Sequence, residues 1–463
     1  MKSFLAVFAL VGFLIPLSGR AATVNVTSTA DSGAGSLRDA IAAASSGDTI
    51  NISVTGTITL TGAPLTIDKS LAISGPGASE LAVSGNKAVQ VFVVNSGATV
   101  TISGLTIENG AASGGGGGIS NSGMLTVTDS VIAGNTTDSF GGGILNLGML
   151  TVANSTVSGN SASCCNGGGI SNLGMLTVTT STVAGNSVAF FYGGGIYNMH
   201  TLNMTNDTLS GNTAGFHGGG IANFGTMTVK NTILANSLKS GNCYMGNGGV
   251  IDSRGHNLSD DASCTTWLTG TGDQDGIATG LDSAGLKNNG GPTWTIALSP
   301  GGAAVDAIPI SPTNYCTLTD GITPVATDQR GVARPGGSAC DIGAFELVQT
   351  TTVTIDIKPG EGPAPINTKS KGTIPVAVLS NSTFDAVTQV DQTSLTFGHT
   401  GSEKSLAFCS GPQDVNGDGL LDLVCHFNTP LTQFQAGDTK GVLKGKILSG
   451  NTIMGSDEVV VLH

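Results

Sequence analysis

The segment GGGILNLGMLTVANSTVSGN, residues 141–160, is one unit of a pattern that occurs five times between residues 114 and 236. Each unit has an isoleucine after a run of glycines, an asparagine two positions later, and a second asparagine near its end. The isoleucines recur every 25 or 26 residues, at Ile119, Ile144, Ile170, Ile196 and Ile221. The asparagine columns are Asn121, Asn146, Asn172, Asn198 and Asn223, and Asn135, Asn160, Asn186, Asn212 and Asn236. This period indicates a solenoid, because each unit can bury its apolar side only against its neighbours.

The residues between the two asparagines predict which solenoid this is. In the segment at residues 149–153, Leu and Val alternate with Thr, which is the period of a half-buried strand. The unit contains no helical periodicity, and its glycine runs permit tight corners. Stacked asparagines can pass amide hydrogen bonds from coil to coil. The pattern therefore predicts an all-β fold, a right-handed parallel β-helix with one coil per unit.

The flanking sequence predicts three further parts. Residues 1–21 have the charged start, apolar run and small residues of a secretory signal peptide. Ser36 precedes a short amphipathic segment, residues 37–44, that predicts a helix covering the open end of the first coil. We expect the β-helix with its cap to occupy residues 22–348. Residues 349–463 predict a small C-terminal β domain with a sandwich-like arrangement.

The charge and the cysteine content of the chain limit the location and the partners that we expect for the protein. The 463-residue chain has 31 acidic and 18 basic residues and a net charge of −13, which argues against nucleic acid or an anionic membrane as partner. No segment after the signal peptide predicts a transmembrane helix, so we expect a secreted or cell-surface protein. The cysteine spacing favours three disulfides, Cys243–Cys264, Cys316–Cys340 and Cys409–Cys425. The adjacent Cys164 and Cys165 could form a disulfide, stay free or bind a metal.

Several motifs together resemble a known group of proteins. The motifs are TSTADSGAGSLRDAI near the start, the glycine-rich coils, NNGGPTWTIAL and DQRGVARPGGSACDIGAFE. They resemble bacterial secreted β-helix proteins of the choice-of-anchor Q type, and the coils are similar to repeats of polymorphic outer-membrane proteins. The resemblance covers residues 23–346. It implies a cell-surface β-helix protein without an assigned activity.

The C-terminal domain contains a candidate calcium loop. Residues 414–422 place oxygen donors at alternating positions, which suits a hard cation. The expected ligands are Asp414, Asn416, Asp418, the backbone carbonyl of Leu420, and Asp422. An acidic turn without an ion is the alternative. A calcium ion here would be structural, because the loop leads directly into an apolar strand.

The coils offer little catalytic chemistry. Polysaccharide-cleaving β-helix enzymes need clustered carboxylates with a basic residue, and Asp129 and Asp207 fall in different columns of the repeat. We therefore expect a non-enzymatic, adhesin-like protein that binds a polysaccharide or a surface partner. The alternative is a polysaccharide lyase or glycoside hydrolase with its site in irregular coils beyond residue 236. Its candidate residues are Asp328, Arg330, Arg334 and Asp341, near Asp306 and Glu346, although ion pairs that tie the last coil to its disulfide-closed cap are the favoured explanation.

Overall fold

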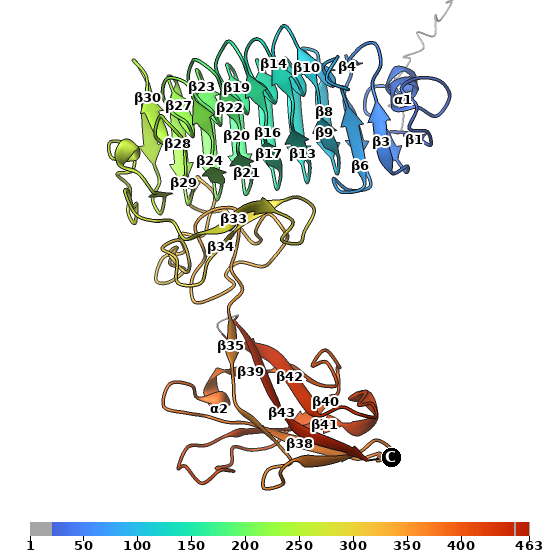
Figure 1. Ribbon diagram of the computed structural model, residues 1–463, viewed down its shortest axis with the longest axis vertical. Helices are drawn as coiled ribbons and strands as arrows, with labels where there is room; N and C mark the ends of the chain where they lie inside the picture. Colours follow the sequence, from blue (N-terminus) through green and yellow to red (C-terminus); the bar gives the residue numbers. More distant parts are fainter. Residues whose placement is uncertain (1–20, 449–450, 463) are drawn as a thin grey trace, which may run out of the picture.

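The computed structural model describes residues 21–448 and 451–462. Of the predicted signal peptide, all but Ala21 lies outside the described residues. The chain forms a parallel β-solenoid of about nine turns, followed by a C-terminal domain of mainly antiparallel sheets (Figure 1). The predicted parallel β-helix is thus confirmed. Among the described residues, no helix has the length and apolar character needed to cross a bilayer.

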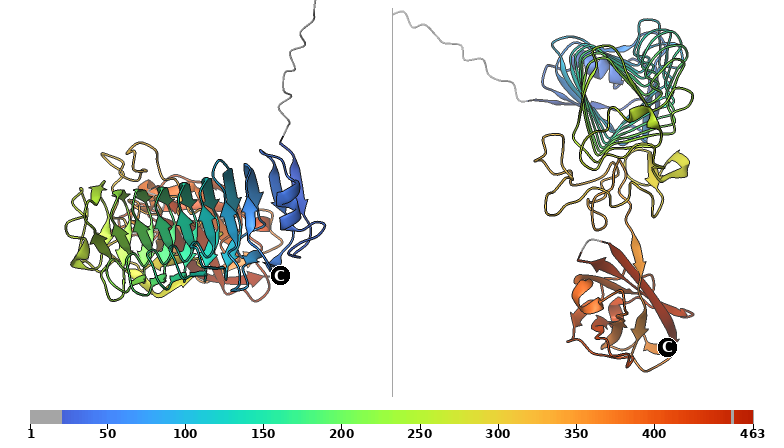
Figure 2. Two further views of the ribbon diagram at one scale, coloured as in Figure 1. Left: turned by 90° about the horizontal axis from the view of Figure 1, so that it is seen from above. Right: turned by 90° about the vertical axis from the view of Figure 1, so that its left-hand side faces the viewer.

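Four parallel sheets, here called sheets A to D, run along the solenoid (Figure 2). Sheet A contains β1 (Thr23–Val26), β2 (Thr49–Ile52), β5 (Leu71–Ser74), β8 (Thr99–Ser103), β12 (Met124–Thr128), β16 (Met149–Ala153), β20 (Met175–Thr179), β24 (Thr201–Thr205), β28 (Thr226–Lys230) and β31 (Val250–Ser253). Sheet B contains β3 (Gly56–Thr59), β6 (Leu81–Ser84), β9 (Thr106–Glu108), β13 (Val131–Ala133), β17 (Thr156–Ser158), β21 (Thr182–Ala184), β25 (Thr208–Ser210), β29 (Ile233–Ala235) and β32 (Leu258–Ser259).

Sheet C contains β4 (Leu65–Ile67), β7 (Phe92–Val94), β11 (Ile119–Asn121), β15 (Ile144–Asn146), β19 (Ile170–Asn172), β23 (Ile196–Asn198), β27 (Ile221–Asn223) and β30 (Cys243–Met245). Sheet D is limited to the middle coils and contains β10 (Ala111–Ala112), β14 (Thr136–Thr137), β18 (Ser161–Ala162), β22 (Ser187–Val188) and β26 (Thr213–Ala214). The alternation in the sequence decides which residues face inward. In β16, for example, Leu150 and Val152 are buried, whereas Thr151 between them is half-buried on the outer face.

The two asparagine columns form buried hydrogen-bond ladders. In the first, each Nδ2 donates to Oδ1 of the asparagine in the next coil at 2.7 to 2.8 Å, from Asn121 to Asn223. The second ladder runs from Asn135 to Asn212 at 2.9 to 3.0 Å. Asn236 was expected to extend it, but this prediction is wrong. Its side chain is exposed and bonds Ser210 instead, because the chain leaves the regular coil after β29.

A short non-repetitive segment lies at each end of the solenoid. Helix α1 (Leu37–Ala43) begins after Ser36, whose side chain accepts the Asp39 amide, and its Leu37 and Ile41 pack into the core. That α1 protects the first coil from edge pairing stays a prediction. At the other end, the short helix η1 (Ala262–Cys264) is joined to β30 by the predicted Cys243–Cys264 disulfide. Trp267, which follows η1, is buried in the same core.

Residues 279–347, here called the flanking segment, do not continue the solenoid. We expected irregular coils here, but the segment has only the antiparallel pair β33 (Leu281–Lys287) and β34 (Thr295–Leu298), and it lies alongside sheet B (Figure 1). Its buried Ile308, Ile342 and Phe345 share one apolar cluster with Ile233 of β29. The cause lies in the sequence, because the glycine and asparagine period that stacks the coils stops before this segment.

The C-terminal domain has two sheets around one core. They contain β35 (Thr350–Thr352), β36 (Ile355–Ile357), β37 (Ala364–Asn367), β38 (Thr373–Val378), β39 (Val390–Gly398), β40 (Leu406–Cys409), β41 (Leu423–Asn428), β42 (Lys440–Ile447) and β43 (Thr452–Leu462), with the short helices α2 (Ala386–Gln389) and η2 (Thr429–Leu431). Phe397 of one sheet packs against Phe427 of the other, with ring centroids 5.0 Å apart. The predicted disulfides Cys409–Cys425 here and Cys316–Cys340 in the flanking segment both form.

Candidate functional site

The charged residues of the alternative catalytic site lie together, but inside the flanking segment. Arg330 and Asp328 form an ion pair at 2.7 Å, and their side chains are only 11% and 0% exposed. The Asp328 carboxylate also accepts the amides of Arg330, Val332 and Glu346. The Arg330 guanidinium stacks 3.5 Å above the ring centroid of Phe345. Each of these groups is therefore already engaged in holding the segment together.

A second ion pair is buried more deeply. Arg334 and Glu346 are 2.7 Å apart, and both side chains are 0% exposed. Arg334 also donates to the carbonyls of Asp341 and Gly343, and Glu346 accepts two backbone amides. Burial and the nearby Glu346 raise the pKa of Asp341 to about 7. The carboxylate of Asp341 accepts the amides of Asp306 and Leu347. This geometry supports buried structural pairs, because a substrate cannot reach side chains that are fully covered.

The calcium loop was also predicted from sequence. In the structure, Asp414 accepts two amides of its own loop at 2.8 and 3.0 Å, and Asp418 accepts the amide of Leu420 at 2.8 Å. Asn416 donates to Asp418, and the buried Asp422 accepts two further amides at 2.8 and 3.0 Å. Across residues 21–448 and 451–462, no group of three or more His, Cys, Asp or Glu side chains is arranged around a common metal position. Calcium binding therefore stays a prediction.

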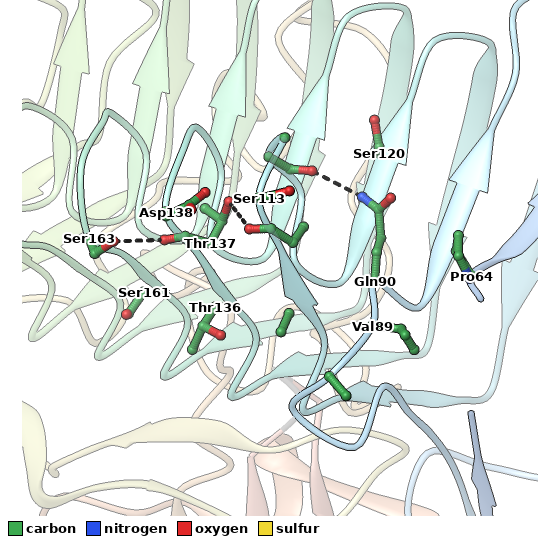
Figure 3. Close-up of a pocket in the computed structure, with 15 residues that line it drawn as sticks. Pro64, Val89, Gln90, Ser113, Ser120, Thr136, Thr137, Asp138, Ser161 and Ser163 are labelled. Atoms are coloured by element: carbon green, nitrogen blue, oxygen red, sulfur yellow. Dashed lines mark hydrogen bonds between the residues drawn. The ribbon is translucent and has the colours of Figure 1, made fainter. Parts of the chain in front are cut away.

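A groove with a volume of about 830 Å³ lies at the N-terminal end of sheet D (Figure 3). Of its fifteen lining residues, seven have a hydroxyl or amide side chain, seven are apolar or glycine, and Asp138 is the one charged residue. The polar residues that line it are Gln90, Ser113, Ser120, Thr136, Thr137, Asp138, Ser161 and Ser163. Gln90 holds one wall in place, because its Nε2 donates to the carbonyls of Gly115 and Gly116 at 3.0 and 2.6 Å.

The groove arises from a change in coil size. Residues 85–91 connect β6 directly to β7, whereas the longer segment 109–118 connects β9 to β11 and contains β10. Every coil from β10 to β26 has this additional strand, so the smaller coil before it leaves a step in the surface. Gly115 permits the close approach of the next coil, since a Cβ there would lie 2.7 Å from the Phe140 carbonyl oxygen.

A row of hydroxyl groups continues from the groove along the outer face of sheet D. The strand register stacks Thr136, Ser161, Ser187 and Thr213, one from each successive coil. Beyond the row, the loops after β22 and β26 present exposed aromatic rings. Phe190 is 71% exposed and Phe216 is 55% exposed. A polar row with an aromatic end is suited to a sugar chain, whose rings have hydroxyl edges and apolar faces.

No residue of this groove was predicted from sequence as a site residue, and neither were Trp294 and Gln329, which lie inside the quoted motifs. The loop Cys164–Cys165 follows Ser163 of the groove, and its two Sγ atoms are 3.0 Å apart without a bond. Gln90 and the sheet D hydroxyls carry no local signal, because Ser and Thr are common throughout the repeat. The aromatic run Phe190–Phe191–Tyr192 is the one local feature that could have indicated this surface.

Asp207 is a fully buried carboxyl group within the solenoid. It belongs to a column of residues, one from each coil, in which each side-chain oxygen accepts a hydrogen bond from the backbone amide of the residue one coil earlier. The members of this column are Ser130, Ser155, Ser181, Asp207, Thr232 and Asn257. Asp207 accepts the amides of Ser181 and Thr205 at 2.9 and 3.0 Å. Burial nevertheless raises the pKa of Asp207 well above its usual value. As expected from sequence, Asp129 lies in a different column, at a corner residue with φ of 49°.

We expect Asp207→Ser to raise the melting temperature at neutral pH. Because the pKa of Asp207 is higher in the folded than in the unfolded protein, folding favours its protonated form. The stability of the folded protein therefore falls as the pH rises above the pKa of Asp207 in the unfolded chain. In the same column, Ser181 accepts the backbone amide of the previous coil without carrying a charge. Each kcal/mol of stability that is regained raises the melting temperature by about 2–4 °C. Melting curves should show the gain at pH 7 and its loss near pH 4. The exposed Asp68→Ser variant is the control. If Asp207→Ser changes the melting temperature by the same amount at both pH values relative to this control, the explanation is contradicted.

No protein-family model matches the chain, and the comparison with curated proteins gives no match. The resemblance to choice-of-anchor Q proteins thus stays a prediction. Among solved structures, the chain is similar to one titled pectate lyase Pel9A, with a TM-score of 0.39 and 15% sequence identity. The similarity covers 70% of this chain and 97% of that one.

Proposed function

We propose that this protein is an exported, non-catalytic β-solenoid that binds a neutral polysaccharide along sheet D. The observation that carries the proposal is the lining of the groove in Figure 3, whose polar side chains are neutral hydroxyl and amide groups and a single carboxylate, Asp138, set among small apolar residues and glycines. Such groups can exchange hydrogen bonds with sugar hydroxyls. Glycoside hydrolysis ordinarily requires two carboxylates that flank the bond, and this groove supplies one.

The charge of the chain narrows the ligand class. With a net charge of −13, the protein repels polyanions such as uronic acid polymers at low salt. A neutral polymer has no such penalty, and the exposed rings of Phe190 and Phe216 can stack on the apolar faces of its sugars. The three disulfides indicate folding in an oxidising environment and support export, as does the predicted signal peptide.

The binding site is tested by removing one hydroxyl at a time from full-length protein. Ser161→Ala should weaken binding to a neutral polysaccharide about fivefold, the loss of roughly one hydrogen bond of about 1 kcal/mol. Thr151→Val is the matched control, because it removes a hydroxyl from the outer face of sheet A. Calorimetric titration with each polymer measures the difference. Equal affinities for wild type and Ser161→Ala would contradict a site on sheet D.

We further propose that residues 414–422 bind calcium with a structural role in the C-terminal domain. The support is the spacing of the oxygen donors and the exposure of Asp414, Asn416 and Asp418 on one loop. Binding would require these side chains to turn from the loop amides toward one ion. Millimolar calcium should raise the melting temperature of wild type, and Asp414→Asn with Asp418→Asn should abolish the rise. No rise in the wild type would contradict calcium binding.

A further inference from the structure

A second groove, of about 510 Å³, lies between sheet B and the flanking segment. Sheet B supplies its floor through Thr106, Glu108, Val131, Ala133 and Ser158, and the loop before β34 supplies its wall. The small side chains of Ala133 and Val131 leave the space open. The groove is separate from the one on sheet D, since the two share no lining residue. Its volume is within the range of about 300–1,000 Å³ that is usual for small-ligand sites.

Trp294 is the main aromatic residue of this groove, and its side chain is 53% exposed. The other tryptophan of the chain, Trp267, is 2% exposed in the solenoid core. An exposed indole loses the stabilisation that burial would give, about 25 cal/mol for each Å² left in water. Within the described part of the chain, the ring of Trp294 takes part in no aromatic pair or cation–π contact. About half of the surface of Trp294 is therefore open to a ligand.

The backbone around Trp294 is held firmly although the ring is exposed. The carbonyl oxygen of Trp294 accepts hydrogen bonds from Oγ1 of Thr156 at 2.6 Å and from Nε2 of Gln329 at 3.1 Å. The neighbours Thr293 and Thr295 are buried, and the Thr293 hydroxyl donates to the Asn154 carbonyl. These contacts tie the loop to the solenoid. The backbone that carries the ring is thus fixed before any ligand arrives, which reduces the entropic cost of binding.

The polar groups of the groove are suited to a sugar ring. Glu108 lies half-buried on β9 and can accept from two neighbouring sugar hydroxyls, and the hydroxyls of Ser79 and Ser158 complete the polar side. Trp294 provides the apolar side on which a pyranose face can stack. We propose that this groove is a second glycan site, which binds one or two neutral pyranose residues between Trp294 and Glu108. It does not depend on the sheet D site.

The two tryptophans make the proposal directly measurable. Full-length protein is titrated with neutral cello-, malto-, xylo- and manno-oligosaccharides while intrinsic fluorescence is recorded. We expect at least one oligosaccharide to change the emission of Trp294, and Trp294→Ala to abolish the change and weaken binding about tenfold. Glu108→Gln should weaken binding while it preserves the fluorescence change. The control Ile322→Ala removes an 81% exposed side chain elsewhere in the flanking segment and should change neither readout.

The outcomes separate this site from the sheet D site. If no neutral oligosaccharide changes the emission of wild type at millimolar concentrations, the second site is disproved. A change that persists in Trp294→Ala comes from Trp267 and disproves it equally. If Ser161→Ala weakens polymer binding but leaves the fluorescence titration unaltered, both sites exist and act independently. Loss of the fluorescence response in Ser161→Ala would show that the groove has no site of its own.

Discussion

Replacing Glu346 by alanine is expected to destabilise the flanking segment by about 3–5 kcal/mol, the range for removing one partner of a buried ion pair. Glu346 is 0% exposed, and its carboxylate pairs with Arg334 at 2.7 Å. It also accepts the amides of Gly336 and Asp341 at 2.6 and 3.0 Å. Without the carboxylate, a buried guanidinium loses its counter-charge and two buried amides lose their acceptor.

Hydrogen exchange followed by mass spectrometry measures this effect locally. Peptides from residues 279–347 should exchange faster in Glu346→Ala, whereas peptides from the coils β10 to β26 should keep their protection. The exposed Glu361 gives the matched control, Glu361→Ala, which should leave both regions unchanged. A different result would contradict a purely structural role for the Arg334–Glu346 pair. It is that Glu346→Ala binds polysaccharide normally but loses a catalytic turnover that the wild type shows.

Replacing Asn172 by leucine should destabilise the solenoid by about 3–5 kcal/mol. Asn172 is the central member of the first ladder and is 0% exposed. Its Nδ2 donates to Asn198 Oδ1 at 2.7 Å and to the Thr201 carbonyl at 2.9 Å, and its Oδ1 accepts from Asn146 at 2.7 Å. Leucine has a similar size but satisfies none of these groups, and each unsatisfied buried group costs about 1–3 kcal/mol.

The outer face of the same solenoid supplies the control. Asn203 stands between Thr177 and Thr228 in the register of sheet A, where it is half-buried on the surface. Asn203→Thr restores the residue type of its neighbours and should change stability by less than about 0.5 kcal/mol. Chemical denaturation of the three proteins measures both effects. A stable Asn172→Leu protein would mean that the ladder is not required for stacking.

The solenoid could be predicted from sequence because its information is local and repeated. One unit specifies an inward Leu and Val, two asparagines and a glycine corner, and the next unit repeats them in register. The three disulfides followed from short spacings between cysteines. The end of the second ladder could not be predicted, since Asn236 still follows the pattern although the backbone has left the coil.

The flanking segment and the two grooves could not be predicted in this way. Gln329 reaches Thr156 and Thr182, which are 173 and 147 positions away in the chain. Nothing in the local sequence around Gln329 specifies that contact. The exposure of Trp294 depends on the same packing, because the segment could equally have buried its indole. The charged residues near Asp328 were predicted as an alternative catalytic site because of their chemical types. Their burial could not be predicted, because it depends on contacts between residues that are distant in the sequence.

Binding of a neutral polysaccharide without cleavage is tested by recording binding and product release together. Purified mature protein is incubated with a panel of neutral and acidic polysaccharides, with and without calcium, and bound polymer and released products are quantified in the same samples. The account predicts retention of at least one neutral polymer with no reducing ends or unsaturated products above the protein-free control. Release of such products, or binding confined to acidic polymers, would contradict it.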